Sequence, residues 1–184
     1  RSGCEHVMLT DRNVSESRIP IPMILATGAV HSHLVRQQLR TFASVNVASG
    51  ECLDVHHFAV LIGVGATTVN AYVAEAAIVE RHERGLLVGM ELRDAVCNFT
   101  KAVEEGLLKI MSKMGISVIA SYRGGYNFEA LGLSRSLVAD YFPPMSSRIS
   151  GLGLKGIATR VIEMHNKAFA NDDVHLPVGG FFRY

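Results

Sequence analysis

Cysteine is scarce in this sequence, and tryptophan is absent from its 184 residues. The three cysteines, Cys4, Cys52 and Cys97, are odd in number, far apart and without a C-x-x-C pair. Such a set predicts neither a disulfide framework nor a self-contained zinc site. Reduced thiols in a cytoplasmic protein are the expectation.

Long hydrophobic runs and an excess of charge are also missing. No uninterrupted apolar stretch is long enough to suggest a membrane span, and no charged-then-apolar leader suggests secretion. Lys and Arg number 18 against 17 Asp and Glu, so overall charge gives no support to a nucleic-acid interface. We therefore expect neither a membrane nor a nucleic acid as partner. The chain opens with Arg1 rather than methionine, which indicates a fragment or a processed product.

Hydrophobic residues make up 48% of the chain, enough for a core that buries about 70% of the unfolded surface. Their spacing predicts short strands that alternate with longer helices. Asp54 is a candidate N-cap, and Gly85 a helix stop. The expected strands are 6–11, 43–49, 66–71 and 116–121, and the expected helices are 21–40, 54–63, 72–85, 90–114, 126–131 and 156–169.

Four successive strand-then-helix units predict a mostly parallel sheet with helices packed outside it. Four units are half of an eight-unit barrel or a small open layer, and the half-barrel fits a fragment better. The fold class is thus α/β, with βα units forming part of an incomplete (βα) barrel-like domain. We assign 1–142 to this domain and 143–184 to a helical or irregular connector.

Two motifs have plain explanations. "GLGLKG" (151–156) fits G-x-G-x-x-G, but "PPMSSRIS" before it is not a central strand, as a dinucleotide site requires. Glycines that ease entry into the following helix explain it equally well. Two histidine pairs, His31 with His33 and His56 with His57, have spacings that cannot place both rings on one metal. We predict no catalytic, cofactor-binding or metal-binding residue from these motifs.

Asp11 and Arg12 lie at the carboxyl end of the first predicted strand, where α/β proteins place ligands. An ion pair that fixes the loop is the favoured interpretation, ahead of catalysis. Ser121, Tyr122 and Arg123 lie at the carboxyl end of the fourth predicted strand, before a pair of glycines and a predicted helix. That chemistry suits an anion, and a tight turn with Arg123 paired to a neighbouring domain explains it as well.

Four long stretches, in order, resemble the large (alpha) subunit of glutamate synthase. They are "LTDRNVSESRIPIPMILATGAVHSHLVRQQLR", "DVHHFAVLIGVGATTVNAY", "GLLKIMSKMGISVIASYRGGYNFEALGL" and "SSRISGLGL". The resemblance implies the later part of that subunit's central domain and the start of the connection to its flavin-binding barrel.

In that family, ammonia released from glutamine by an amidotransferase domain reaches 2-oxoglutarate bound near flavin mononucleotide (FMN). Electrons come through an iron–sulfur cluster from a reductase small subunit or from ferredoxin. The resemblance implies that this part is catalytically silent, joins the amidotransferase and FMN domains, and helps to wall the ammonia passage. None of its cysteines matches the family's catalytic or cluster motifs, so FMN and the cluster are expected elsewhere in the parent enzyme.

Two alternatives remain open: a small anion- or phosphate-binding module that uses the 121–125 loop, and an interaction module that docks through 143–184. Under the resemblance, the candidate interdomain or passage-lining residues are Asp11, Arg12, Ser121, Tyr122 and Arg123.

Overall fold

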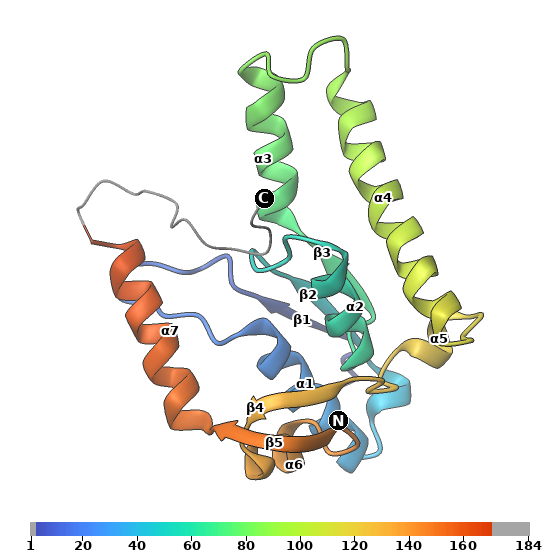
Figure 1. Ribbon diagram of the computed structural model, residues 1–184, viewed down its shortest axis with the longest axis vertical. Helices are drawn as coiled ribbons and strands as arrows, with labels where there is room; N and C mark the ends of the chain where they lie inside the picture. The colour runs from blue at the N-terminus through green and yellow to red at the C-terminus, as the bar shows by residue number, and fades with distance from the viewer. Residues whose placement is uncertain (1–2, 171–184) are drawn as a thin grey trace.

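Three short parallel strands form the centre of the molecule, in the order β1-β2-β3 (Figure 1). The computed structural model describes residues 3–170. Its elements are β1 (His6–Thr10), α1 (Met23–Arg36), the 3-10 turn η1 (Arg40–Phe42), β2 (Ser44–Ala48), α2 (Val55–Gly63), β3 (Thr68–Asn70), α3 (Tyr72–Glu83), α4 (Leu92–Lys113), α5 (Ile119–Tyr122), β4 (Glu129–Leu133), α6 (Arg135–Tyr141), β5 (Ser146–Leu152) and α7 (Leu154–Ala168).

The main core lies where β2 meets the surrounding helices. Val45 and Val47 on β2 are fully or almost fully buried, and they share one cluster with Met23 of α1 and Phe58 of α2. Val103 of α4 packs against the same cluster. Since β2 has a strand on each side, its alternating apolar residues meet helices rather than water. The predicted succession of βα units over 6–85 is confirmed.

Two helices begin with different kinds of cap. Asp54 accepts hydrogen bonds from the backbone N–H groups of His56 (2.8 Å) and His57 (3.3 Å), which confirms the predicted N-cap of α2. Pro22, at the N-cap of α1, has no side-chain hydrogen bond to offer. Instead Glu51, from the loop after β2, accepts from the N–H of Met23 at 2.8 Å. The start of α1 is therefore tied to the end of β2.

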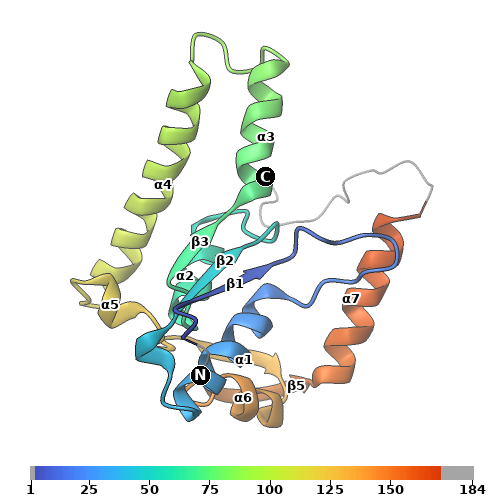
Figure 2. The same cartoon turned by 180° about the vertical axis from the view of Figure 1, so that it is seen from behind.

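A helical hairpin made by α3 and α4 projects beyond the sheet in both ribbon views (Figures 1 and 2). The chain reverses at Gly85 and Gly89, which both adopt positive φ. Val88 in this turn is 93% exposed, and Leu86 and Met90 are also exposed. The base of the hairpin packs on α2, so only its far end lacks contact with the core.

The fourth predicted unit is wrong in both elements. Residues 116–121 form no strand; Ile119–Tyr122 make one helical turn, and Val118 and Ile119 are 54% and 46% exposed. Tyr122 is buried and Ile116 is half-buried, and both pack against α2 and α4 and not into a sheet. The predicted helix 126–131 is likewise absent, because Tyr126 and Gly132 have positive φ and Glu129–Leu133 is a strand.

That strand, β4, pairs in parallel with β5 in a separate two-stranded sheet. β5 runs into "GLGLKG" and includes its first two residues, and it is exposed along most of its length, so the motif does not follow a buried central strand. Gly151 lies so close to Gly132 that an added Cβ would meet the Gly132 carbonyl oxygen at 2.3 Å. Gly151, the first glycine of the motif, therefore lets β5 lie close to β4.

The described chain contains parallel strands and alternating βα units but no closed barrel, as the α/β expectation stated. β5 and α7 fall inside the segment assigned to the connector, whose residues beyond 170 lie outside the description. None of the helices within 3–170 meets the length and hydropathy needed to cross a membrane. The boundary at 142 stays a prediction.

Candidate functional site

Asp11 lies at the carboxyl end of β1 and accepts hydrogen bonds from residues that follow the other two strands of the sheet. Its carboxylate accepts from the Ser49 hydroxyl (2.8 Å), the Gly50 N–H (3.0 and 3.1 Å to the two oxygens) and the Tyr72 hydroxyl (2.8 Å). Ser49 and Gly50 follow β2, and Tyr72 follows β3. The three strand ends are thus held together by one carboxylate.

Arg12 faces Tyr72 and not Asp11. Its guanidinium carbon lies 4.5 Å from the centre of the Tyr72 ring, and Nη2 donates to Asn70 Oδ1 at 3.2 Å. Burial and the hydrogen bond to Asp11 raise the pKa of Tyr72 to about 12. The phenol is therefore a neutral donor at physiological pH.

The predicted ion pair between Asp11 and Arg12 is wrong. No ion pair joins them among residues 3–170, because Asp11 takes neutral donors and Arg12 makes a cation–π contact. The loop is nevertheless fixed. An acid whose oxygens both accept hydrogen bonds from the fold is poorly placed to move a proton for a substrate.

Arg123 lies at the opposite edge of the sheet, and this also differs from the prediction. It lines a pocket with His6 and Ser44, the first residues of β1 and β2. Since 116–121 is not a strand, its end does not join the carboxyl edge where Asp11 lies. The two predicted clusters therefore lie at different edges of the sheet.

Ser121 and Tyr122 face different surroundings from Arg123. Ser121 is exposed, whereas Tyr122 is fully buried against Ala59 and Met111. The Tyr122 hydroxyl has no hydrogen-bond partner among the described residues. Arg123 lines this pocket, whereas Ser121 and Tyr122 are not among its lining residues, so the three neighbours do not form a common site there.

The pocket beside Arg123 has a volume of about 510 Å³ and contains His31 and Arg40. Arg40 donates through Nε to His31 Nδ1 at 3.0 Å and through Nη2 to the Gly65 carbonyl at 2.9 Å. Burial, followed by the charges of Arg40 and Arg123, lowers the pKa of His31 to about 4. His31 is therefore neutral at physiological pH.

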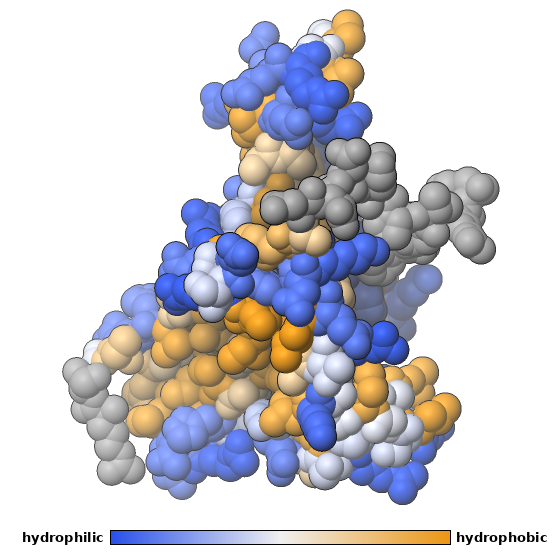
Figure 3. Space-filling model, turned by 90° about the vertical axis from the view of Figure 1, so that its left-hand side faces the viewer, coloured by the Kyte–Doolittle hydropathy of each residue, from blue (hydrophilic) through white to orange (hydrophobic). Residues whose placement is uncertain are grey.

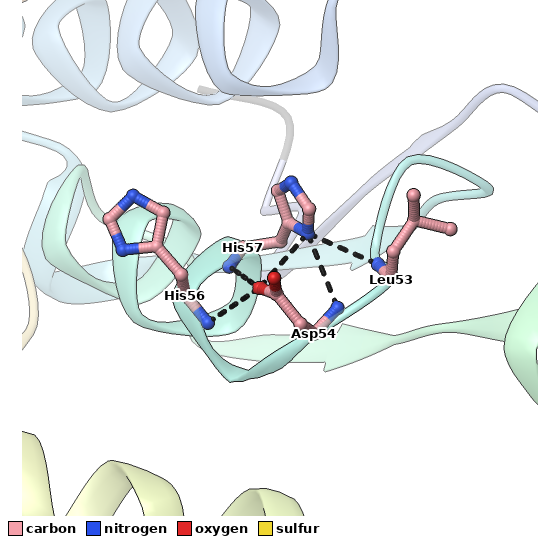
Figure 4. Close-up of polar contacts among 4 residues, drawn as sticks. All are labelled: Leu53, Asp54, His56 and His57. Atoms are coloured by element: carbon pink, nitrogen blue, oxygen red, sulfur yellow. Dashed lines mark hydrogen bonds and ion pairs between the residues drawn. The ribbon is translucent and has the colours of Figure 1, made fainter. Parts of the chain in front are cut away.

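The adjacent histidines on α2 are structural in part (Figure 4). His57 Nδ1 accepts from the N–H groups of Leu53 (3.2 Å) and Asp54 (3.3 Å), which completes a capping box. The His56 ring points elsewhere, with the two ring centres 6.4 Å apart. Across residues 3–170 no three His, Cys, Asp or Glu side chains are grouped to hold a metal.

A groove of about 480 Å³ separates α1 from α7. Its walls are apolar, with Ile21 and Leu25 on one side and Ile157 and Val161 on the other. Figure 3 faces the side on which α7 lies and shows hydrophobic residues gathered over the lower half of the molecule. The surface of the chain therefore offers an apolar groove and, separately, a basic pocket.

Sequence reasoning missed most of the residues around both edges. Ser49 and Tyr72 lie at the carboxyl ends of predicted strands just as Asp11 does, so the same strand-end criterion would have found them. His31 and Arg40 had no such signal. Arg40 reaches Thr67 across 27 positions, a contact that no local pattern indicates.

Residues 1–134 match the family model described as "Glutamate synthase central domain". Over its full length the chain is 62% identical to "Glutamate synthase [NADPH] large chain" of Azospirillum brasilense, covering 12% of that protein. It is 42% identical over 170 residues to the protein of the same name from Bacillus subtilis, covering 92% of this chain and 11% of the relative. It is 39% identical over 197 aligned residues to "Ferredoxin-dependent glutamate synthase 2" of Synechocystis, covering 100% of this chain and 13% of that relative.

The chain therefore spans only about an eighth of the length of these curated relatives. The match to the family model extends over more than two thirds of the chain, and the identities to separate relatives agree with it. The chain belongs to the glutamate synthase central domain family.

Proposed function

We propose that this chain is the central-domain segment of a glutamate synthase polypeptide and is catalytically silent by itself. In the parent enzyme, glutamine, 2-oxoglutarate and a reductant yield two molecules of glutamate. The segment joins the amidotransferase and FMN domains and helps to wall the passage for ammonia. FMN and the iron–sulfur cluster belong to other parts of that cytoplasmic polypeptide, and the reductant arrives through a reductase small subunit or ferredoxin.

The main support for catalytic silence is that the Asp11 carboxylate is occupied by hydrogen bonds within the fold. Asp11 is the acidic residue best placed for chemistry at the carboxyl edge of the sheet, and both its oxygens accept hydrogen bonds from the fold. The exposed cysteines Cys4 and Cys97 have no activating histidine among the described residues, and burial raises the pKa of Cys52 to about 11. A thiol with that pKa is a poor nucleophile.

Arg12 and Arg123 support a joining role. Both are exposed, and they lie at opposite edges of the sheet. A segment between two domains needs contacts on two sides, and exposed arginines favour polar interfaces of this kind. Neither residue needs to touch a reacting atom for this role.

The first test measures glutamate formed from glutamine and 2-oxoglutarate by this chain alone. We expect none above the buffer rate. Steady formation of glutamate would refute the claim of silence.

The second test uses the full-length polypeptide that contains this segment and measures glutamate formed per glutamine hydrolysed. We expect Arg12→Ala and Arg123→Ala to lower this ratio by about twofold or more, since an interface contact of about 0.5–1 kcal/mol is lost in each. Arg93→Ala, which removes an exposed arginine of α4 that makes no described contact, is the matched control. An unchanged ratio in both variants would refute the joining role of these residues.

A further inference from the structure

The basic pocket at the amino edge of the sheet holds two arginines, neither of which is paired with a carboxylate of the described residues. Its walls include Glu5, His6, His31, Arg40, Thr67 and Arg123. No ion pair involves either arginine among residues 3–170. Glu5, the one acid in the wall, is exposed and pairs with neither.

Arg40 is bound entirely by neutral acceptors. Besides His31 and Gly65, it donates to Thr67 Oγ1 at 3.2 Å and to the Ala43 carbonyl. These bonds use both hydrogens of Nη2, the hydrogen of Nε and one hydrogen of Nη1, which leaves one Nη1 hydrogen. They fix the guanidinium in place and leave its charge uncompensated.

Arg123 brings a second positive charge to the same space. Its guanidinium makes no hydrogen bond to the described residues, so all five of its donors are available. The pKa of Arg40 is lowered by burial and by the charge of Arg123. The two guanidinium groups therefore repel each other, and an anion between them relieves this repulsion.

His31 adds a neutral donor at the same wall. Because Nδ1 accepts from Arg40, the proton of the neutral ring lies on Nε2. Gly65 and Gly124 pack against the ring so closely that an added Cβ would come within 2.2 Å of Nδ1 and 2.9 Å of Cε1. These two glycines hold the imidazole in one orientation.

We propose that this pocket is a binding site for a single carboxylate, held by the guanidinium fork of Arg123, the remaining Nη1 hydrogen of Arg40 and His31 Nε2. A planar fork matches the two oxygens of a carboxylate. Glu5 at the wall disfavours a doubly charged phosphate, because like charges repel. The helix that the sequence predicted after Gly125 plays no part, because Glu129–Leu133 is a strand.

The test follows the imidazole signals of His31 by NMR in the 184-residue chain, with acetate as the probe and sodium chloride at equal ionic strength as the reference. We expect a saturable shift at millimolar acetate, and a rise in the pKa of His31 when acetate is bound, because a bound anion favours the charged ring. A linear response, or an equal response to chloride, would overturn the proposal. Tighter binding of inorganic phosphate than of acetate would overturn the carboxylate class.

Three variants test whether acetate binds at a specific site or is attracted only by the positive charge of the protein surface. Arg123→Gln is expected to weaken acetate binding by about tenfold or more, as loss of a charge-assisted bidentate contact requires. Arg123→Lys, which keeps the charge without the fork, is expected to bind with intermediate affinity. Arg93→Gln removes the same charge from α4 and should leave acetate binding unchanged. Equal affinities for all four proteins would refute the site, provided that thermal melts show each variant folded.

The carboxylate can be a free small acid or an Asp or Glu side chain from elsewhere in a longer polypeptide. A crystal structure of the full-length polypeptide soaked in acetate distinguishes these sources. Acetate or a carboxylate side chain between Arg40 and Arg123 supports the proposal and names the source. A hydrophobic side chain filling the pocket contradicts it.

Discussion

At the scale of single residues, Asp11 links distant parts of the chain through its hydrogen bonds. It joins positions that lie 38 and 61 residues away in the chain, through neutral donors on Ser49 and Tyr72. Charge-assisted bonds of this kind are stronger than neutral ones. Removal of one of these hydroxyls should therefore weaken the carboxyl edge of the sheet.

Tyr72→Phe tests one of these hydrogen bonds. The change removes the donor at 2.8 Å from Asp11 and should lower the free energy of unfolding by about 1 kcal/mol. Chemical denaturation at pH 7 measures it. Tyr141→Phe is the matched control, since the Tyr141 hydroxyl makes no hydrogen bond to residues 3–170. Equal losses in both variants would contradict the special role of the Asp11 contact.

The opposite change is expected at Tyr122. Its hydroxyl is fully buried and has no described partner, so Tyr122→Phe removes a polar group that was desolvated without compensation. We expect the free energy of unfolding to rise by about 1 kcal/mol. A clear loss of stability on denaturation would show that the hydroxyl contributes a bond after all.

His31 gives a pH dependence with a definite sign. Its pKa falls from 6.5 to about 4 on folding, so the unfolded chain binds more protons in this range. The stabilisation that comes from the neutral ring is complete above pH 6.5 and is lost as the pH falls toward 4. Arg40 and Arg123 oppose protonation, while Glu5 and His6 also line the pocket.

The measurement for His31 is the unfolding free energy between pH 7 and pH 4. His31→Asn keeps an acceptor for Arg40 but cannot titrate, and it should show a shallower loss of stability with acid. His33→Asn, at an exposed position on the same helix, is the control. Identical slopes for His31→Asn and the unchanged chain would contradict the lowered pKa.

At the scale of elements, the periodicity of the sequence correctly predicted those helices and strands whose formation depends on residues nearby in the chain. Asp54 before "VHHF" and the alternating "SVNVA" gave α2 and β2 close to their observed bounds. The wrong predictions concern segments whose secondary structure depends on contacts with residues distant in the chain. Val118 and Ile119 are apolar yet exposed, and β4 forms because β5, later in the chain, pairs with it. The pocket around Arg40 could not be predicted either, because its residues also come from distant parts of the chain.

The cap of α1 shows an element that depends on a distant side chain. Glu51→Ala removes the carboxylate that accepts from Met23 N–H and should lower the unfolding free energy by about 1 kcal/mol, as loss of an N-cap does. Glu104→Ala, at an exposed position on α4, serves as the control. Denaturation curves that coincide for the two variants would refute this capping role.

At the scale of the whole molecule, the second small sheet tests the predicted boundary at 142. A chain that ends at 142 loses β5, the partner of β4, and exposes Leu137 and Val138 where Met145 and Ile157 covered their cluster. We therefore expect it to melt at a lower temperature than a chain that ends at 170. Equal melting temperatures would support 142 as a boundary between independent units.

The strand order β1-β2-β3 leaves the outer sides of β1 and β3 without a strand neighbour among residues 3–170. Met8, on β1, is 65% exposed. Unpaired strand edges with apolar side chains invite pairing between chains. Handled apart from a longer polypeptide, the chain should therefore associate with itself as its concentration rises, before it unfolds. A short charged peptide that pairs with β1, or a lysine introduced on β1, should block this association.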